Sequence, residues 1–334
     1  MPFISEIWKY SSLSVAGLEK NTGKTECLNY ILNRMKDSGK TVAVTSIGID
    51  GEGIDQVTHT HKPEIEIYRD MIFTTSEKHY KSKLLTAEIM AIGSKHTSLG
   101  RLVTARAKTQ GKVLLSGPTD SVWLQELLTE LRNLNVVTTL VDGALSRLSL
   151  SAPTVTEAMV LATGAALSSN ISELVKKTTF TYTLIQLQQV AADLRRKLAG
   201  ISKGIWAIDN DNQLHDLNIV SALSIESYPN LFEHGSKFFV AGAVSDKLLN
   251  YLRIQKQVEQ IEVVVKDFSR LFISPDTYST FISKGGKISV LQQPSLLAIC
   301  VNPVAPNGYR LNSDDLISRL KENIHVPIYD IKQL

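Results

Sequence analysis

The clearest pattern near the start of the chain is an apolar run at residues 13–16, followed by a polar loop and an amphipathic segment. Apolar side chains recur in that segment at helical spacing: Cys27, Leu28, Ile31, Leu32 and Met35. Residues 37–39 (Asp-Ser-Gly) end the periodic stretch, and a second apolar run follows at residues 41–47. This order predicts a strand, a loop, a helix and a second strand.

Shorter runs predict how the first half of the chain continues. The expected elements are a β-hairpin (64–67 and 71–75), a helix (83–92) and two strands joined by a turn (101–108 and 112–116). Asp120 can cap a helix whose leucines recur at helical spacing, namely Leu124, Leu127, Leu128 and Leu131. A strand over residues 136–141 and a helix over residues 156–167 complete this half.

The second half alternates between short apolar runs and amphipathic segments. The residue pattern changes before this half begins, and we place a domain boundary near residue 180. A long amphipathic helix is predicted over residues 184–198. The elements expected beyond it are strands (205–208, 238–241, 261–265, 288–291, 296–301 and 326–331) and helices that begin at Ser245 and Asn312. Such alternation is typical of a parallel or mixed α/β layer.

Composition agrees with a globular protein of two domains. The chain has 334 residues, of which 43% are hydrophobic and 21% charged. A net charge of +3, spread evenly, gives no reason to expect nucleic acid as a partner. No apolar run approaches a membrane span and residues 1–6 lack a leader pattern, so we expect a cytoplasmic protein with no membrane partner. Both cysteines, Cys27 and Cys300, lie in apolar runs and are expected to be buried thiols.

Residues 17–25 read Gly-Leu-Glu-Lys-Asn-Thr-Gly-Lys-Thr, a Walker A phosphate-binding loop between a predicted strand and a predicted helix. Its glycines let backbone N–H groups turn toward an anion, Lys24 reaches the terminal phosphates, and the Thr25 hydroxyl faces Mg²⁺. Five residues separate Gly17 from Gly23, one more than in the commonest pattern. The residues expected to bind nucleotide are Gly17, Lys20, Asn21, Thr22, Gly23, Lys24, Thr25 and Glu26.

Carboxylates at predicted strand ends are the candidates for holding Mg²⁺, which prefers hard oxygen ligands. Asp50 ends the strand after the loop helix, and Asp142 follows a largely apolar run in a Walker B-like pattern. Either one joins Thr25 as a metal ligand, and the expected catalytic group is Lys24, Asp50 and Glu52, in which Glu52 can orient water or a metal ligand. The alternatives are a capping role for either aspartate and a solvent-exposed turn position for Glu52.

Other polar residues have less specific patterns. Lys20 can neutralise phosphate charge or reach across a homodimer interface, and a solvated loop lysine is the alternative. His59 and His61 suit a transition metal, although two histidines in a polar loop are more often exposed. Residues 302–306 follow a predicted strand, where open α/β sheets hold ligands, and are interpreted as a rigid turn.

Several runs taken together resemble the reactivase subunit family associated with lysine 5,6-aminomutase: residues 17–25, 45–52, 115–118, 141–147 and 162–165. The loop alone is also similar to the longer loop of the dethiobiotin synthetase and cobyric acid synthase group. The first resemblance covers about half of the chain and the second about a third. The resemblances imply a P-loop NTPase domain of mostly parallel sheet over residues 1–180, within an α/β fold. The alternation of apolar runs and amphipathic segments that follows predicts a second α/β domain over residues 181–334.

The reactivase resemblance implies an ATP-dependent accessory factor of lysine fermentation. Such a factor uses ATP (or GTP) and Mg²⁺ to exchange damaged cobalamin on an adenosylcobalamin-dependent aminomutase, together with a second reactivase subunit. The chain lacks the Asp-x-His-x-x-Gly pattern with which many mutases bind cobalamin, so the cobalamin belongs to the partner. Two alternatives stay open: a dethiobiotin synthetase-like ligase or kinase acting on a small carboxylate or amine, and a nucleotide-dependent scaffold without turnover.

Overall fold

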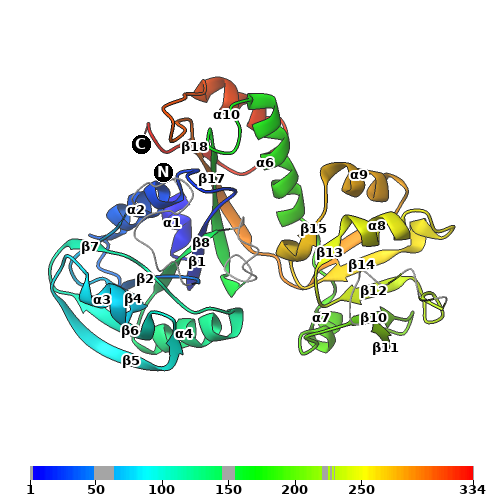
Figure 1. The fold of residues 1–334 in the computed structure, drawn as a ribbon, viewed down its shortest axis with the longest axis horizontal. Helices are drawn as coiled ribbons and strands as arrows, with labels where there is room; N and C mark the ends of the chain where they lie inside the picture. The colour runs from blue at the N-terminus through cyan, green and yellow to red at the C-terminus, as the bar shows by residue number, and fades with distance from the viewer. Residues whose placement is uncertain are drawn as a thin grey trace. The chain divides into compact units, whose positions relative to one another are not determined.

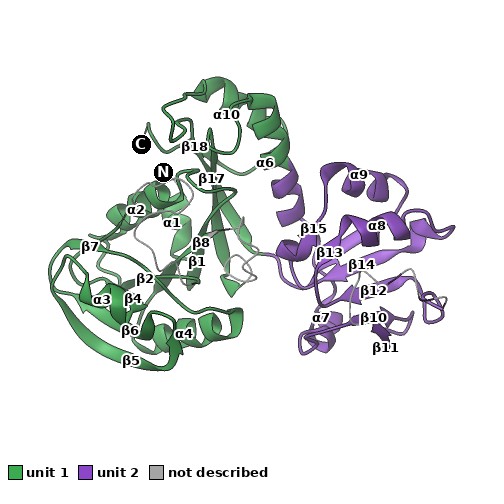
Figure 2. Ribbon diagram, in the orientation of Figure 1, with its two compact units in different colours: residues 1–179, 294–334 green, residues 180–293 purple. Residues whose placement is uncertain are grey.

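The computed structural model describes most of the chain as two compact units (Figure 2). The described residues are 3–48, 64–144, 155–219, 225, 228 and 230–333. Unit 1 comprises residues 1–179 and 294–334, and unit 2 comprises residues 180–293. No helix among the described residues is long and apolar enough to cross a membrane.

Within the described residues, unit 1 is built on a nine-stranded sheet in the order β18-β17-β9-β1-β8-β2-β4-β6-β5 (Figure 1). The strands are β1 (Ser12–Gly17), β2 (Val42–Ser46), β4 (Ile72–Ser76), β5 (Ala87–Thr97), β6 (Gly100–Ala107), β8 (Thr138–Ala144), β9 (Ala158–Gly164), β17 (Ser295–Asn302) and β18 (Ile328–Asp330). The run from β18 to β4 is parallel throughout, and β6 and β5 add an antiparallel edge. The fold is therefore α/β with a large, mostly parallel sheet.

Alternating side chains divide the central strands between two helical layers. Val42 and Val44 of β2 join the core beneath α2, whereas Ala43 between them packs with leucines of α4. This is the two-residue period of a strand that is buried on both faces. The helices of unit 1 are α1 (Phe3–Ile7), α2 (Lys24–Met35), α3 (Glu77–Lys81), α4 (Ser121–Asn133), α10 (Ser313–Lys321) and most of α6 (Ile171–Ile185).

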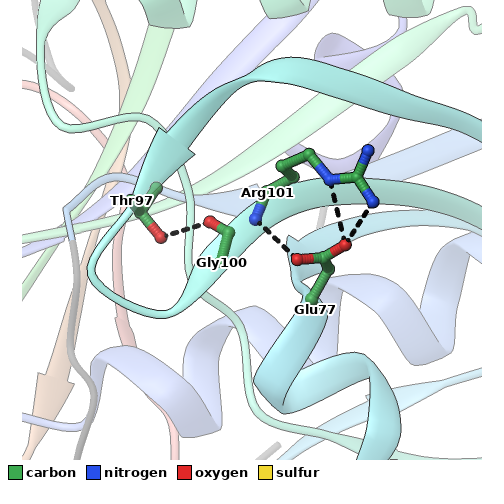
Figure 3. A network of polar contacts seen from close by, with 4 residues as sticks. All are labelled: Glu77, Thr97, Gly100 and Arg101. Atoms are coloured by element: carbon green, nitrogen blue, oxygen red, sulfur yellow. Dashed lines mark hydrogen bonds and ion pairs between the residues drawn. The ribbon is translucent and has the colours of Figure 1, made fainter.

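The antiparallel edge is fixed by a polar network between α3 and the turn that joins β5 to β6 (Figure 3). Glu77 accepts hydrogen bonds from the backbone N–H of Arg101 and from its Nε and Nη2 atoms, the last at 2.7 Å. Thr97 Oγ1 donates to the Gly100 carbonyl at 2.7 Å across the turn. The Arg101 hydrogen bonds lower the pKa of Glu77 below its ordinary value.

Unit 2 has its own sheet, which in the described residues has five strands in the order β11-β10-β12-β14-β16. Its elements are α7 (Ala192–Leu198), β10 (Ile205–Ile208), β11 (Leu214–Ile219), β12 (Lys237–Val240), β13 (Val244–Ser245), α8 (Asp246–Leu252), η2 (Val258–Gln260), β14 (Glu262–Val265), η3 (Phe268–Arg270), β15 (Leu271–Phe272), α9 (Pro275–Ser283) and β16 (Lys287–Val290). Strands β12, β14 and β16 are parallel, whereas β10 runs antiparallel to β11 and β12. Leu194 and Leu198 of α7 pack on Phe239 and Val264 on one face.

Two segments predicted as helices are strands in the structure. The first, residues 83–92, contributes to β5, which pairs with β6 through a register that shifts twice. These shifts break the two-residue alternation by which a strand is recognised. The second, residues 156–167, contains β9, whose seven residues are all buried between β1 and β17. A run that is apolar on both faces has no period that separates strand from helix.

Two further predictions are corrected by long-range pairing. Residues 64–67 and 71–75 do not form a hairpin: β3 (Ile65–Ile67) pairs with β7 (Gly111–Val113), and β4 pairs with β2 and β6. The predicted helix over residues 184–198 is two helices, because Gln188 and Val190 form backbone hydrogen bonds with Val290 at the end of β16.

The two units divide the chain near the predicted boundary at residue 180, but the second unit ends earlier than residue 334. Residues 294–334, which the sequence analysis assigns to the second domain, belong to unit 1. The reason is the pairing of β17 with β9 and of β18 with β17, which extends the sheet of unit 1.

Candidate functional site

The 17–25 loop lies at the carboxyl end of β1, in the middle of the large sheet. Strand β1 is flanked by β8 and β9, and both neighbours are parallel to it. The loop is tied to β9 at its start, because the Leu18 N–H donates a 3.0 Å hydrogen bond to the Ala162 carbonyl. Open α/β sheets bind ligands at this edge, outside the carboxyl ends of parallel strands.

The loop backbone turns sharply at several positions. Asn21 and Gly23 have positive φ angles of 62° and 90°. A Cβ atom on Gly17 would lie 2.8 Å from Thr22 Oγ1 and 3.1 Å from the Glu19 carbonyl oxygen. Thr22 Oγ1 donates a 2.9 Å hydrogen bond to that same carbonyl. The loop therefore curls over Gly17, which leaves no room for a side chain there.

Helix α2 begins at the end of this loop without a side-chain cap. Its N-cap residue is Gly23, which has no side chain that could accept a hydrogen bond from the first-turn N–H groups. These N–H groups have no partner within the helix, and the helix dipole adds partial positive charge at the same end. Lys24 and Thr25 are the first two residues of α2. The start of α2 can therefore hold an anion such as a phosphate group.

Lys24 forms an ion pair with Asp142 of β8. The distance from Lys24 Nζ to Asp142 Oδ1 is 3.0 Å, and the two side chains are 23% and 17% exposed. Asp142 lies opposite Val15 of β1 and opposite Ser46 of β2. The Walker B-like position predicted from the sequence is thus on the strand next to the loop, with its carboxylate at the loop lysine.

The carboxylate of Asp142 retains capacity for a further partner. Its Oδ1 atom is buried and forms no hydrogen bond with any described residue, since its contact with Lys24 is an ion pair without hydrogen-bond geometry. The Asp142 backbone is held in place by the Ile47 N–H, which donates to its carbonyl at 3.1 Å. The Lys24 ammonium offsets part of the cost of burying this carboxylate, and a ligand that contacts Oδ1 directly would lower the free energy of the site further.

Residues at the ends of the C-terminal strands β17 and β18 pack against the loop. The sequence analysis did not predict this contact. A Cβ atom on Gly23 would lie 2.3 Å from Ile331 Cδ1 and 2.8 Å from Asn302 Cβ. Lys332, one residue after Ile331, forms a 2.5 Å ion pair with Glu26 of α2. Asn302 is the last residue of β17 and Ile331 is the first residue after β18, and the pairing of β17 with β9 and of β18 with β17 brings both to the loop.

The two cysteines are also brought together by this packing. Both are buried, as the sequence predicts, and the Cys27 thiol donates a hydrogen bond to Cys300 Sγ at 3.2 Å. That hydrogen bond and burial raise the pKa of Cys27 well above its ordinary value. Helix α2 thus contacts β17 through a pair of buried thiols.

Replacement of Gly23 by alanine is expected to destabilise the protein more than the same replacement at Gly39. Both glycines have positive φ, 90° and 69°, but a Cβ on Gly39 would meet no described atom within 4 Å. The left-handed backbone costs about 1–2 kcal/mol for either alanine, and only Gly23→Ala adds a clash. Chemical denaturation of both variants measures the difference; equal free energies of unfolding would contradict the close packing of Ile331 and Asn302 on Gly23.

The structure describes most, but not all, of the predicted site residues. It brings the 17–25 loop and Asp142 together, whereas Asp50, Glu52, His59 and His61 lie outside the described residues. Gly48 is the last described residue before Asp50. Its N–H donates a hydrogen bond to the Pro118 carbonyl, and its carbonyl accepts one from the Gly117 N–H. No group of three or more His, Cys, Asp or Glu side chains among the described residues could hold a metal ion by itself.

A comparison of the chain with protein families, curated proteins and solved structures finds no match in any of the three.

Proposed function

We propose that the chain binds a Mg-nucleotide, ATP or GTP, on the 17–25 loop and hydrolyses it to drive a change in a partner enzyme. The observation that carries this proposal is the 3.0 Å ion pair of Lys24 with Asp142 at the carboxyl ends of adjacent parallel strands. A loop lysine, an uncapped helix start and a strand-end carboxylate are the groups that nucleotide phosphates and Mg²⁺ require.

The side chains beside the loop fit a magnesium ion. Asp142 Oδ1 is a buried oxygen that forms no hydrogen bond with any described residue, and the Thr25 side chain is half-buried on the first turn of α2. Magnesium takes few protein oxygens and completes its shell with phosphate oxygens and water, so Thr25 and Asp142 would suffice, with Asp50 as a further candidate. When bound, the ion neutralises charge on the phosphate oxygens.

The ion pair also suggests how nucleotide binding begins. Lys24 is held against Asp142 and is 23% exposed, so its ammonium is already positioned beside the uncapped start of α2. Phosphate oxygens compete with the carboxylate for this ammonium because they carry more charge. Lys24 would then turn from Asp142 to the phosphates, which frees Asp142 Oδ1 to act as a ligand.

For the partner, we propose an adenosylcobalamin-dependent aminomutase, assisted by a second reactivase subunit. This rests on the resemblance of five runs to the reactivase family. Two of those runs contact the loop, since the Ala162 carbonyl accepts from the Leu18 N–H and Asp142 pairs with Lys24. A third run contacts the residues after β2, where the Gly117 N–H donates to the Gly48 carbonyl. These runs lie at the same edge of the sheet although they are far apart in sequence. This supports the proposal that the chain has the same kind of function as the reactivase family.

The proposed function predicts slow nucleotide hydrolysis by the chain alone and faster hydrolysis with its partner. Phosphate release is measured with and without an aminomutase, and activity of an inactivated aminomutase is followed after addition of ATP and fresh adenosylcobalamin. A non-hydrolysable ATP analogue is the matched control and should give no recovery. Fast turnover triggered by a small carboxylate or amine, with no recovery of mutase activity, would instead favour a dethiobiotin synthetase-like ligase or kinase.

A further inference from the structure

The two cysteines of the chain meet inside unit 1, although they are 273 positions apart in the sequence. Cys27 is the fourth residue of α2, and Cys300 lies in β17. Their Sγ atoms are 3.2 Å apart, and both residues are fully buried. The chain contains no other cysteine. Each thiol therefore has one possible partner for a disulfide within the chain, and the two are already in contact.

The apolar core on the α2 side of the sheet surrounds this pair. Cys27 and Cys300 belong to one cluster of buried residues with Leu28 and Val160, and Tyr329 packs against that cluster. Such surroundings suit two thiols or a disulfide equally well, because neither form carries a charge that burial would penalise. The core can therefore accommodate the pair in both redox states.

The cysteine pair is also joined to the proposed nucleotide site. The Cys27 N–H donates a 2.9 Å hydrogen bond to the Gly23 carbonyl, which closes the helical turn that begins with Lys24. Cys300 lies opposite Ala162 of β9, whose carbonyl accepts a hydrogen bond from the start of the 17–25 loop. A bond between the two sulfurs would therefore link the start of α2 to the strands on one side of the loop.

We propose that Cys27 and Cys300 form an oxidative modification site, at which a hydroperoxide closes a disulfide that weakens nucleotide binding at the 17–25 loop. The effect on nucleotide rests on the proposed function, whereas the formation of the disulfide does not. The oxidant class is represented by hydrogen peroxide, a small uncharged molecule.

The chemistry takes two steps. In the first, one sulfur attacks the O–O bond of the peroxide and becomes a sulfenic acid, and the other peroxide oxygen leaves as water with the thiol proton. In the second, the other sulfur displaces the hydroxyl group of the sulfenic acid, the S–S bond forms, and the hydroxyl group leaves as water with the second thiol proton. Two thiols are thus oxidised while one peroxide is reduced to two molecules of water.

Burial makes the first step slow and dependent on the start of α2. A peroxide reaches the sulfurs only when the first turn of α2 moves away from β17, because both cysteines are fully buried. That turn has no side-chain cap to stabilise it. A phosphate group bound at the start of α2 would stabilise the turn and slow the oxidation. The second step is fast, since the two sulfurs are neighbours.

The position of β17 in the sheet gives the direction of the effect on nucleotide. A disulfide bond is about 2 Å long, shorter than the present contact between the sulfurs, so closing it draws the first turn of α2 toward β17. Strands β17 and β8 lie on opposite sides of β1. The shift therefore moves Lys24 away from Asp142 of β8, and misplacement of a charged group by about 1 Å weakens its interactions strongly.

The disulfide is tested first, with the unaltered chain and hydrogen peroxide. After treatment the chain is denatured, alkylated and analysed by mass spectrometry. We expect a monomer that has lost two hydrogen atoms and takes up no alkyl group, and dithiothreitol should restore both alkylation sites. Mg-ATP present during the treatment should slow this reaction severalfold. Thiols that stay open to alkylation, or disulfides that form only between chains, would overturn the proposal.

The effect on nucleotide is tested by calorimetric titration of Mg-ATP into the reduced and the oxidised chain. We expect severalfold weaker binding after oxidation and full recovery with dithiothreitol. Methionine sulfoxide needs dedicated reductases, so this recovery identifies the disulfide without any variant. Cys300→Ala is the matched control, and peroxide should leave its affinity unchanged.

The two measurements separate failure of this inference from failure of the proposed function. If the reduced chain does not bind Mg-ATP, the proposed function is wrong and the link to nucleotide falls with it, while the mass measurement still decides whether the disulfide forms. If the reduced and oxidised chains bind Mg-ATP equally well, the proposed function stands and the proposed link between the disulfide and the loop is overturned.

Discussion

Replacing Lys24 by alanine is expected to lower the affinity for Mg-nucleotide about 100-fold or more while the fold is kept. The ammonium nitrogen of Lys24 lies 3.0 Å from Oδ1 of Asp142, the carboxylate at the end of β8. Loss of one member of a charge-assisted pair costs about 2–5 kcal/mol, and each 1.4 kcal/mol is a factor of ten in affinity.

Calorimetric titration of Mg-ATP and Mg-GTP measures this loss, with circular dichroism to compare the folds. Lys78→Ala, at an exposed lysine of α3, is the matched control and should leave affinity unchanged. Lys24 is not in the hydrophobic core, so its replacement should spare the sheet. Unchanged affinity of the Lys24→Ala variant would remove the basis of the proposed function.

Replacing Asp142 by asparagine is expected to lower Mg²⁺-dependent turnover about 10–100-fold, the range typical of residues that hold or orient a metal shell. Nucleotide binding should fall much less, because the loop N–H groups and Lys24 still meet the phosphates. Asparagine keeps the shape of the side chain and removes its charge. The substitution therefore separates metal binding from packing between β1 and β2.

Turnover is measured over a range of Mg²⁺ concentrations, so that a weaker metal site is seen as a higher Mg²⁺ requirement. Asp37→Asn, an exposed aspartate after α2, is the matched control. Asp50→Asn, made in parallel, tests the other predicted carboxylate. Undiminished turnover in both the Asp50 and Asp142 variants would show that neither residue has this role.

The sequence predicted those parts of the fold whose causes are local. Helix α4 begins where Asp120 accepts a hydrogen bond from the Trp123 N–H, and Leu124, Leu127, Leu128 and Leu131 are buried along one side. Capping and helical periodicity involve residues only three or four positions apart, so one segment of sequence contains the whole signal. The strand, loop and helix around Gly23 and Lys24 were predicted for the same reason.

The sequence pattern predicted the wrong secondary structure for segments that become strands only by pairing with a distant strand. The segment that enters β5 carries apolar residues at Leu84, Leu85, Ile89 and Ile92, a spacing compatible with a helix. The partner strand β6 and the Glu77–Arg101 contacts make it a strand, and its shifts in register hide the alternation. Strand propensity is weak compared with the free energy of pairing along an available edge, so the sequence pattern alone was insufficient.

The sequence by itself determined the 17–25 loop, its place between a strand and a helix, and the α/β class, because each depends on residues that are neighbours in the chain. The tertiary structure alone decided that β8 lies beside β1, which brings Asp142 to Lys24, and that Asn302 and Ile331 pack on Gly23. These contacts join residues more than 100 positions apart. They arise from the order of strands in the sheet, which no local period or spacing specifies.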